Sequence, residues 1–138
     1  MQNINPDIWG PPGWRFMHYI TLSYPIEPSD KNKEDIKRFF TSVGPVLPCE
    51  SCRIHFNSHR HKHPITDDVL STRDNLVIWL MNIHNEVNLI KGKPIYTLDM
   101  LYDEYMRPKE TLLCDVNYTL LIMLVILIVM YLFRRYYY

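Results

Sequence analysis

Two cysteines separated by two residues, Cys49 and Cys52, are the strongest chemical signal in this sequence. If the segment is helical, residues three apart lie on one face, so the two thiols can close a small disulfide. Pro48 precedes the pair, at a position where a helix can begin without needing the missing backbone donor. A thiolate at a helix N-terminus is stabilised by the peptide dipoles, which favours electron exchange. The pair therefore predicts a redox site, with half of a zinc site or two unrelated core cysteines as alternatives.

The residues after this pair bear on the zinc alternative. Cys49, Cys52, His55 and His59 follow the pattern C-x2-C-x2-H-x3-H. Zinc fingers need a long spacer between the cysteine pair and the histidine pair, so that the chain folds back around the ion. On one continuous helix the four side chains instead form a stripe, which cannot surround an ion tetrahedrally. We therefore predict no metal ligands and interpret the histidines as a solvated basic helix end, or as residues that tune the thiols.

A second polar cluster lies in the segment from His84 to Asn88. His84 and Asn88 are four residues apart and therefore share one face of a helix. Lys91 and Lys93 follow, so the same face could hold an adenine and its diphosphate. A hydrogen-bonded core histidine is the alternative, and on its own this signal is weak.

Helices must position these residues, because no stretch of any length alternates with a period of two. Apolar residues recur at helical spacing, and capping residues or prolines separate the runs. We expect helices over about residues 13–24, 32–47, 49–59, 73–90 and 98–106. Residues 9–12, Trp-Gly-Pro-Pro, are expected to form a turn before the first helix. The predicted fold class is all-α.

Composition limits the class of protein further. The chain has 138 residues, enough for one domain with its own core, and its 15 basic and 15 acidic side chains cancel. No overall field therefore attracts nucleic acid, and no nucleic-acid partner is predicted. Three cysteines are too few for a secreted disulfide scaffold. The N-terminus lacks a charged region followed by an apolar run, so no secretory signal is predicted. Ten tyrosines and three tryptophans could form a core or wall a flat aromatic ligand.

The C-terminal segment is strongly apolar. Residues 116–133 carry no charge, and at about 1.5 Å per residue they span roughly 27 Å as a helix, just enough to cross a hydrocarbon core. Arg134 and Arg135 close the run, and tyrosines flank it where interfacial aromatics belong. We predict a domain over residues 1–108, a linker over 109–115, a transmembrane anchor over 116–135 and a tail over 136–138.

Two arguments about the orientation of this anchor disagree. Arg134 and Arg135 outnumber the balanced charges on the other flank, which by the positive-inside tendency puts the tail in the cytosol. An anchor at the end of a chain without a signal inserts after synthesis, which leaves the preceding domain in the cytosol. We favour the second argument and expect a single-pass protein of a host or virion membrane with a cytosolic catalytic domain.

Three groups of residues, in the same order and spacing, resemble the Erv/ALR family of FAD-linked sulfhydryl oxidases. Residues 9–25 resemble the family's opening W-G-x-x-x-W…H…Y-P. Residues 48–52 resemble its redox-active P-C-x-x-C, and residues 79–94 resemble its flavin segment W…H-N-x-V-N…G-K-P. The resemblance covers about residues 4–106 and is strongest to the short members carried by large DNA viruses.

The resemblance implies a four-helix bundle with a short fifth helix, usually dimeric, that binds FAD at the mouth of the bundle. It implies Cys49 and Cys52 as the catalytic residues. The residues implied to hold FAD come from the first helix, the long fourth helix and the segment after it. They are Gly10, Trp14, His18, Tyr24, Trp79, His84, Asn85, Asn88, Lys93 and Tyr96.

The resemblance also implies a mechanism and partners. Cys49 would meet the thiol of a protein substrate, for which a thioredoxin-like carrier is one candidate. Cys52 would pass two electrons to FAD, and dioxygen would be reduced to hydrogen peroxide. A homodimer and a membrane complete the expected partners.

The sequence departs from the family in two ways. Cys114 is alone, where many cellular members carry a shuttle pair of cysteines on a tail, and no cysteine lies between Arg53 and Leu113 to form the family's structural disulfide. The alternatives to a thiol oxidase are a membrane-tethered zinc-binding or assembly module without catalysis, and a thioredoxin-like oxidoreductase without flavin. The absence of βαβ patterning argues against the latter.

Overall fold

The computed structural model describes residues 2–107 and 113–137, and the side chains of residues 113–117 are not described. These residues form six helices and no strand, which confirms the all-α prediction. The chain divides into two compact units at Met106, the first containing the helical bundle and the second a single long helix. The predicted boundary at residue 108 and most of the predicted linker lie outside the described residues, as does the side chain of Cys114.

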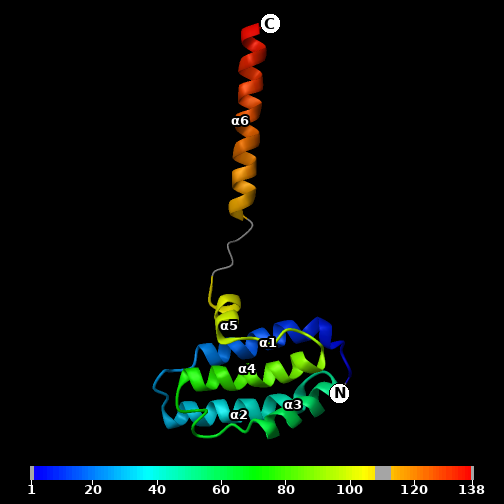
Figure 1. The fold of residues 1–138 in the computed structure, drawn as a ribbon, viewed down its shortest axis with the longest axis vertical. Coiled ribbons are helices and arrows are strands. Elements are labelled where there is room, and N and C mark those ends of the chain that lie inside the picture. Colours follow the sequence, from blue (N-terminus) through cyan, green and yellow to red (C-terminus); the bar gives the residue numbers. More distant parts are fainter. Residues whose placement is uncertain (1, 108–112, 138) are drawn as a thin grey trace. The chain divides into compact units, whose positions relative to one another are not determined.

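Five helices build the first unit (Figure 1). They are α1 (Pro6–Leu22), α2 (Asp30–Val46), α3 (Glu50–Lys62), α4 (Arg73–Ile90) and α5 (Leu98–Tyr105). Ser29, Thr72 and Thr97 cap α2, α4 and α5 by accepting a hydrogen bond from a backbone N–H in the first turn. Such caps satisfy helix-terminal donors that no backbone carbonyl can reach, so these three sequence positions fix where the helices begin.

The start of α1 differs from the sequence prediction. Residues 9–12 do not form a turn, because α1 already begins at Pro6 and includes Pro11 and Pro12. Asn5 caps the helix by accepting a hydrogen bond from the N–H of Asp7, at 3.0 Å. The two prolines lie on the exposed side of the second turn, where water can satisfy the carbonyls that lose their donors. The expected turn was therefore wrong, and Trp9 and Gly10 lie on a helix.

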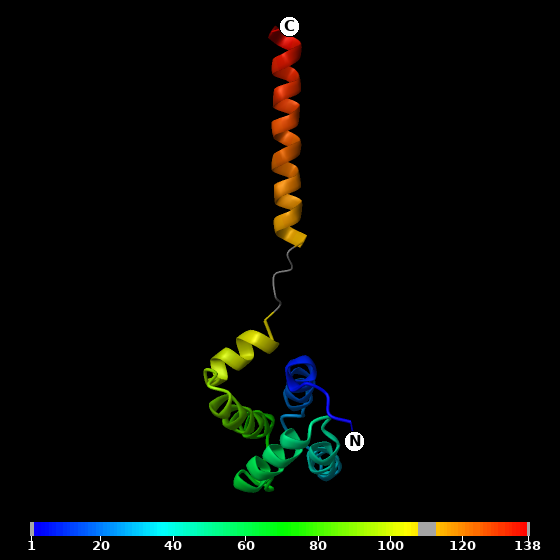
Figure 2. The same cartoon turned by 90° about the vertical axis from the view of Figure 1, so that its right-hand side faces the viewer.

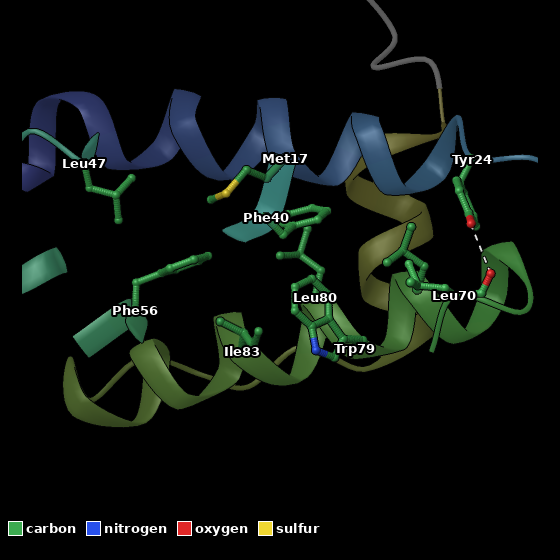
Figure 3. Packing of buried hydrophobic residues seen from close by; sticks show 10 residues of the cluster. Met17, Tyr24, Phe40, Leu47, Phe56, Leu70, Trp79, Leu80 and Ile83 are labelled. Atoms are coloured by element: carbon green, nitrogen blue, oxygen red, sulfur yellow. Dashed lines mark hydrogen bonds between the residues drawn. The ribbon is translucent and has the colours of Figure 1, made fainter. Parts of the chain in front are cut away.

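The five helices lie against one another (Figures 1 and 2) and bury two hydrophobic clusters, a larger one that includes Phe40 and Leu80 and a smaller one that includes Val77 and Leu101. α1 packs on α4, α3 packs on both α2 and α4, and α5 packs on both α1 and α4. Figure 3 shows the middle of this core, where Phe40, Leu80 and Ile83 are completely buried. The hydroxyl of Tyr24 donates to the carbonyl oxygen of Leu70 at 3.0 Å, which ties the end of α1 to the loop before α4.

Two contacts fix the helix that carries the cysteines. α3 approaches α2 so closely at Gly44 that a Cβ there would lie 2.9 Å from Cδ1 of Phe56. At the C-terminal end of α3, the indole N–H of Trp79 donates to the carbonyl of His63 at 2.8 Å. Lys62 and His63 both donate to the carboxylate of Glu86, and these hydrogen bonds lower its pKa to about 2. The helix that carries the cysteines is therefore held at its middle against α2 and at its C-terminal end against α4.

The second unit is α6 (Leu113–Tyr137). Residues 118–137 form a helix that is long and apolar enough to cross a membrane, with a mean hydropathy of 2.0 in its most apolar window. None of that window is buried in the structure. An uncovered apolar helix of this length is typical of a membrane span, although length and composition alone do not place it in a membrane.

Candidate active site

Cys49 and Cys52 form a disulfide at the start of α3, with their Cα atoms 5.1 Å apart. Cys49 is the N-cap residue of α3, and its sulfur accepts a hydrogen bond from the backbone N–H of Cys52 at 3.2 Å. The hydroxyl of Ser51 lies 3.2 Å from the same sulfur. Cys49 is 6% exposed, whereas Cys52 is half-buried. The disulfide that the spacing allows is therefore present, and its two sulfurs have different surroundings.

Cys52 opens onto a cavity of about 740 Å³. Ligand pockets in proteins usually measure about 300–1,000 Å³, so this cavity is large enough for a sizeable cofactor. Its walls come from α1, α3, α4, α5 and the segment after α4. The lining residues include Gly10, Trp14, Cys52, His84, Lys93 and Tyr96.

Three aromatic rings form a layered wall between α1 and α4. The rings of Trp14 and His84 stack in parallel, with centroids 4.0 Å apart and an angle of 9°. Behind them, Nε2 of His18 lies 3.0 Å from Nδ1 of His84, so one ring donates a hydrogen bond to the other. Burial lowers the pKa of His18 to about 4. The pKa of His84 is lowered to about 3, mainly by burial and to a lesser extent by its electrostatic interactions with His18 and Lys93. Both rings are therefore neutral at pH 7.

One buried polar atom in this wall has no hydrogen-bond partner. Nδ1 of His18 is inaccessible to solvent, while Nε2 of the same ring is engaged by His84. Buried polar groups are almost always satisfied, so this nitrogen is a group that a small rearrangement of the wall would satisfy.

The segment after α4 is held by one side chain. Nδ2 of Asn85 donates to the carbonyl of Tyr96 at 2.9 Å, and Oδ1 of Asn85 accepts from the N–H of Tyr96 at 2.7 Å. Gly92 provides the turn with a positive φ of 62°, a conformation that favours glycine. The Tyr96 hydroxyl donates to Glu104 at 2.6 Å, and burial, with this carboxylate, raises its pKa. Lys93 and Tyr96 are thereby fixed on the cavity wall.

The structure brings together most of the residues that the sequence singled out. Cys52, Gly10, Trp14, His84, Asn88, Lys93 and Tyr96 all line the cavity. His18 and Asn85 lie behind this wall and hold it through hydrogen bonds. Tyr24 and Trp79 belong to the hydrophobic core, so the structure gives them a packing role, and a flavin contact for either stays a prediction.

Sequence reasoning missed other residues of the cavity wall. Phe56 and His55 line it from α3, and Tyr105 lines it from α5. Phe56 lies four residues after Cys52, a spacing that places it on the same helix face and could have identified it. Asp7 also lines the cavity and pairs with Lys91 at 2.9 Å, which lowers the pKa of Asp7. This pair joins residues 84 positions apart, so no local pattern predicts it.

Comparison with known proteins defines the class. The model of the Erv1 / Alr family matches residues 12–107, well over half of the chain. The chain therefore belongs to the Erv1 / Alr family. The resemblance inferred from the three sequence motifs is confirmed.

Relatives in this family come from viruses and from cells. The chain is 47% identical over 94 residues to a protein of Acanthamoeba polyphaga mimivirus named "Probable FAD-linked sulfhydryl oxidase R368", a match that covers 68% of this chain and 66% of that protein. It is 31% identical to an African swine fever virus protein named FAD-linked sulfhydryl oxidase, over 63% of this chain and 71% of that protein. The chain spans 42% of the Arabidopsis thaliana relative named ERV1.

Solved structures agree with the fold. The yeast Erv1 core superposes with a TM-score of 0.68 at 23% identity, covering 76% of this chain and 86% of that one. The FAD binding domain of Erv1 from Saccharomyces cerevisiae gives the same TM-score, and the superposition covers 75% of this chain and 95% of that one. At this identity the likeness shows the shared bundle fold.

Proposed function

We propose that this chain is an FAD-dependent thiol oxidase that makes disulfides in protein substrates through Cys49 and Cys52. One observation carries the proposal: Cys52 of the disulfide and the Trp14–His84 stack line the same cavity. Membership of the Erv1 / Alr family and the printed names of the relatives support the same activity.

The residues of the cavity fit FAD. The volume is sufficient, and Trp14 and Tyr96 offer flat apolar surface to a ring system. A Cβ added to Gly10 would meet no atom within 4 Å, so this glycine leaves a part of the cavity open that a ligand can fill. Lys93 supplies a cation for a diphosphate.

The proposed reaction begins with thiol–disulfide exchange. A substrate thiolate attacks Sγ of Cys49, which forms a mixed disulfide, breaks the bond to Cys52 and leaves Cys52 as the thiolate. A second substrate thiolate then attacks the substrate sulfur, which releases the oxidised substrate and leaves Cys49 and Cys52 reduced. The first turn of α3 stabilises the thiolate that forms there. When bound, FAD would accept the two electrons of the reduced pair and supply the reduction of dioxygen to hydrogen peroxide.

The two cysteines have different places in this scheme. Cys52 is the cysteine on the cavity wall, which suits the side that faces the cofactor. Cys49 does not line the cavity, which suits the cysteine that meets the substrate. Burial of Cys49 to 6% exposure means that a substrate needs some local opening to reach it.

A zinc-binding or assembly module is the alternative. Cys49 and Cys52 are joined to each other, and a disulfide sulfur is not the thiolate that zinc binds. Among the described residues, no group of three or more His, Cys, Asp and Glu side chains is arranged to hold a metal ion. The geometry therefore supports the redox function over this alternative.

We also propose that α6 anchors the protein in a membrane with the bundle in the cytosol. The apolar span of residues 118–137 supports the anchor, and Arg134 and Arg135 at its end offer charges for the interface. Protease treatment of intact microsomes that carry the full chain tests the orientation. Digestion of the bundle is expected, and protection of the bundle would contradict it.

We propose in addition that the bundle forms a homodimer. Phe16 on α1 is 59% exposed and contacts only the edge of Phe39 among the ring pairs of the described residues, with centroids 6.2 Å apart. Ile8 and Tyr19 on the same helix are also exposed, and exposed apolar groups that gather on one face mark interaction surfaces. Light scattering of the protein in detergent is expected to give twice the protein mass, and Phe16→Glu is expected to halve it. A wild-type monomer would contradict the dimer.

The activity itself is tested on the purified full chain in detergent. Visible absorption bands of flavin and consumption of dioxygen on adding dithiothreitol are expected, with hydrogen peroxide formed. A colourless protein that contains zinc would contradict the proposal and favour the alternative.

A further inference from the structure

The residues before α1 hold the chain on both sides of Cys49. The N–H of Ile4 donates to the carbonyl of Pro48 at 2.8 Å, and the side-chain oxygen of Asn3 accepts from the N–H of Glu50 at 3.0 Å. Pro48 and Glu50 are the two neighbours of Cys49 in the sequence. We call residues 3–5 the strap.

The strap also connects to α1. Its residue Asn5 caps that helix, and the carbonyl of Ile4 accepts a hydrogen bond from the indole of Trp9 at 3.3 Å. Trp9 lines the cavity. The strap therefore runs from the cavity wall to the first turn of the redox helix and spans the position of Cys49.

The proposed reaction requires a substrate thiolate to approach Cys49 in line with the bond to Cys52. In the structure Cys49 is 6% exposed, and the backbone groups on each side of it are engaged by the strap. A protein substrate carries its cysteine within a backbone, which needs room and hydrogen-bond partners when it comes to this position. The strap already forms hydrogen bonds with the backbone groups that such a peptide would use.

We propose that the strap is a displaceable cover. When it is displaced, an extended cysteine-containing peptide segment of the substrate binds in its place. This inference rests on the proposed thiol oxidase function. When the strap lifts, the carbonyl of Pro48 becomes a free acceptor and the N–H of Glu50 a free donor, on either side of Cys49. Any extended peptide carries the complementary pair of groups, whereas a small thiol such as dithiothreitol carries no backbone.

The strap is weakly enough held to be displaced. Asn3 and Ile4 are both exposed, and the two hydrogen bonds described here are its ties to the cysteine loop. A single such bond changes an opening equilibrium by about two- to tenfold. During exchange the substrate sulfur bonds to Cys49, the bond to Cys52 breaks, and Cys52 leaves as the thiolate, so the step needs no further reactant.

Alkylation of Cys49 tests the cover. In a full-length background with Cys52→Ser and Cys114→Ser, Cys49 is the one remaining thiol of the chain's three. Asn3→Ala is expected to increase the rate of labelling by N-ethylmaleimide about two- to tenfold, because it removes one of the two hydrogen bonds. Asn3→Asp keeps an acceptor oxygen and Gln2→Ala changes an exposed neighbour, so both are expected to label at the background rate. Equal rates for Asn3→Ala and the background would overturn the proposal.

A second pair of variants tests the substrate class. Glu50→Pro removes the N–H at the first position of α3, where proline is well tolerated, and Cys49 already has the extended backbone that precedes a proline (φ −157°, ψ 126°). The control, Glu50→Gln, keeps the N–H. Reduction of the disulfide by an extended cysteine peptide, relative to reduction by dithiothreitol, is expected to fall about two- to tenfold in Glu50→Pro alone. An unchanged ratio would overturn the peptide class.

Neither measurement depends on the cofactor. Labelling and anaerobic reduction of the disulfide, followed by mass spectrometry, require neither FAD nor dioxygen. Failure of the oxidase proposal would appear as a missing flavin or missing consumption of dioxygen, while failure of the strap would appear as equal labelling rates.

Discussion

The rings of Trp14 and His84 stack in parallel at 4.0 Å and join α1 to α4 on the wall of the cavity. Rings at this separation are already in contact, so a third flat ring has no room between them. A flat ligand must lie against the stack or displace one of its members. The stack therefore both packs α1 against α4 and forms the surface against which a cofactor would bind.

Removal of Trp14 tests this arrangement. Trp14→Leu is expected to raise the dissociation constant of FAD at least about tenfold, since it removes aromatic surface and loosens His84. Titration of the apoprotein with FAD, followed by fluorescence, measures the effect. Phe16→Leu, at an exposed position of the same helix that does not line the cavity, serves as the matched control and is expected to change little. Equal dissociation constants for Trp14→Leu and the wild type would contradict the assignment.

Two glycines in helices are expected to respond in opposite ways to the same substitution. A Cβ at Gly44 would lie 2.8 Å from Oδ1 of Asn57, whereas a Cβ at Gly10 would meet nothing within 4 Å. Gly44→Ala is therefore expected to lower the free energy of unfolding by about 1–3 kcal/mol, because α2 and α3 must move apart.

Gly10→Ala serves as the comparison for this pair. Its methyl group projects into open space at the cavity, so the apoprotein keeps its stability or gains up to about 1 kcal/mol from helix propensity. The same methyl group is expected to weaken FAD binding. Guanidinium unfolding of both variants, with FAD titration, checks the pair, and tighter FAD binding by Gly10→Ala would count against the cavity as the flavin site.

The sequence predicted the class of fold because the apolar spacing and the capping residues agree for α2, α4 and α5. It misplaced the start of α1, because Pro11 and Pro12 are ordinarily helix breakers and their exposure on α1 is a property of the packed bundle. The Cys-x-x-Cys pair and the His84 face were visible as local patterns. The Asp7–Lys91 pair and the bonds from residues 3 and 4 to the cysteine loop join distant segments, so only the folded chain reveals them.

The buried histidine pair predicts acid sensitivity. The pKa of His18 is about 4 in the folded state, below its ordinary value of 6.5, because burial disfavours the charged ring. The unfolded chain therefore binds this proton first, and the stability that the neutral ring contributes is present above pH 6.5 and lost as pH falls towards 4. The loss for this ring amounts to about 3 kcal/mol.

Unfolding in guanidinium between pH 7.5 and 4.5 measures this dependence. His18→Gln cannot take up a proton and can still form a hydrogen bond with His84, so its stability is expected to fall less steeply with decreasing pH. His61→Gln, at an exposed position of α3, is expected to keep the wild-type slope. The same slope in all three proteins would show that the buried pair does not control the acid response.

Asn85 offers a test of how the segment after α4 is held. Asn85→Asp keeps the acceptor for the N–H of Tyr96 but loses the donor to its carbonyl, which places two oxygens in contact. A loss of about 1–3 kcal/mol in unfolding free energy is expected, together with weaker FAD binding, because Lys93 and Tyr96 lose their support. Asn82→Asp, at an exposed position of the same helix, is the control. An unchanged free energy of unfolding for Asn85→Asp would mean that these two hydrogen bonds do not stabilise the fold.

Anaerobic reduction of the flavin by dithiothreitol, in wild-type protein and in Cys52→Ala, tests the central claim most directly. The account predicts that both proteins bind FAD, that the visible bands of the wild type bleach and recover when dioxygen is admitted, and that Cys52→Ala neither bleaches at that rate nor turns over. Cys49→Ala is also expected to lose turnover, since it cannot form the mixed disulfide. Bleaching of Cys52→Ala at the wild-type rate would contradict the proposed path of electrons from the disulfide into the cavity.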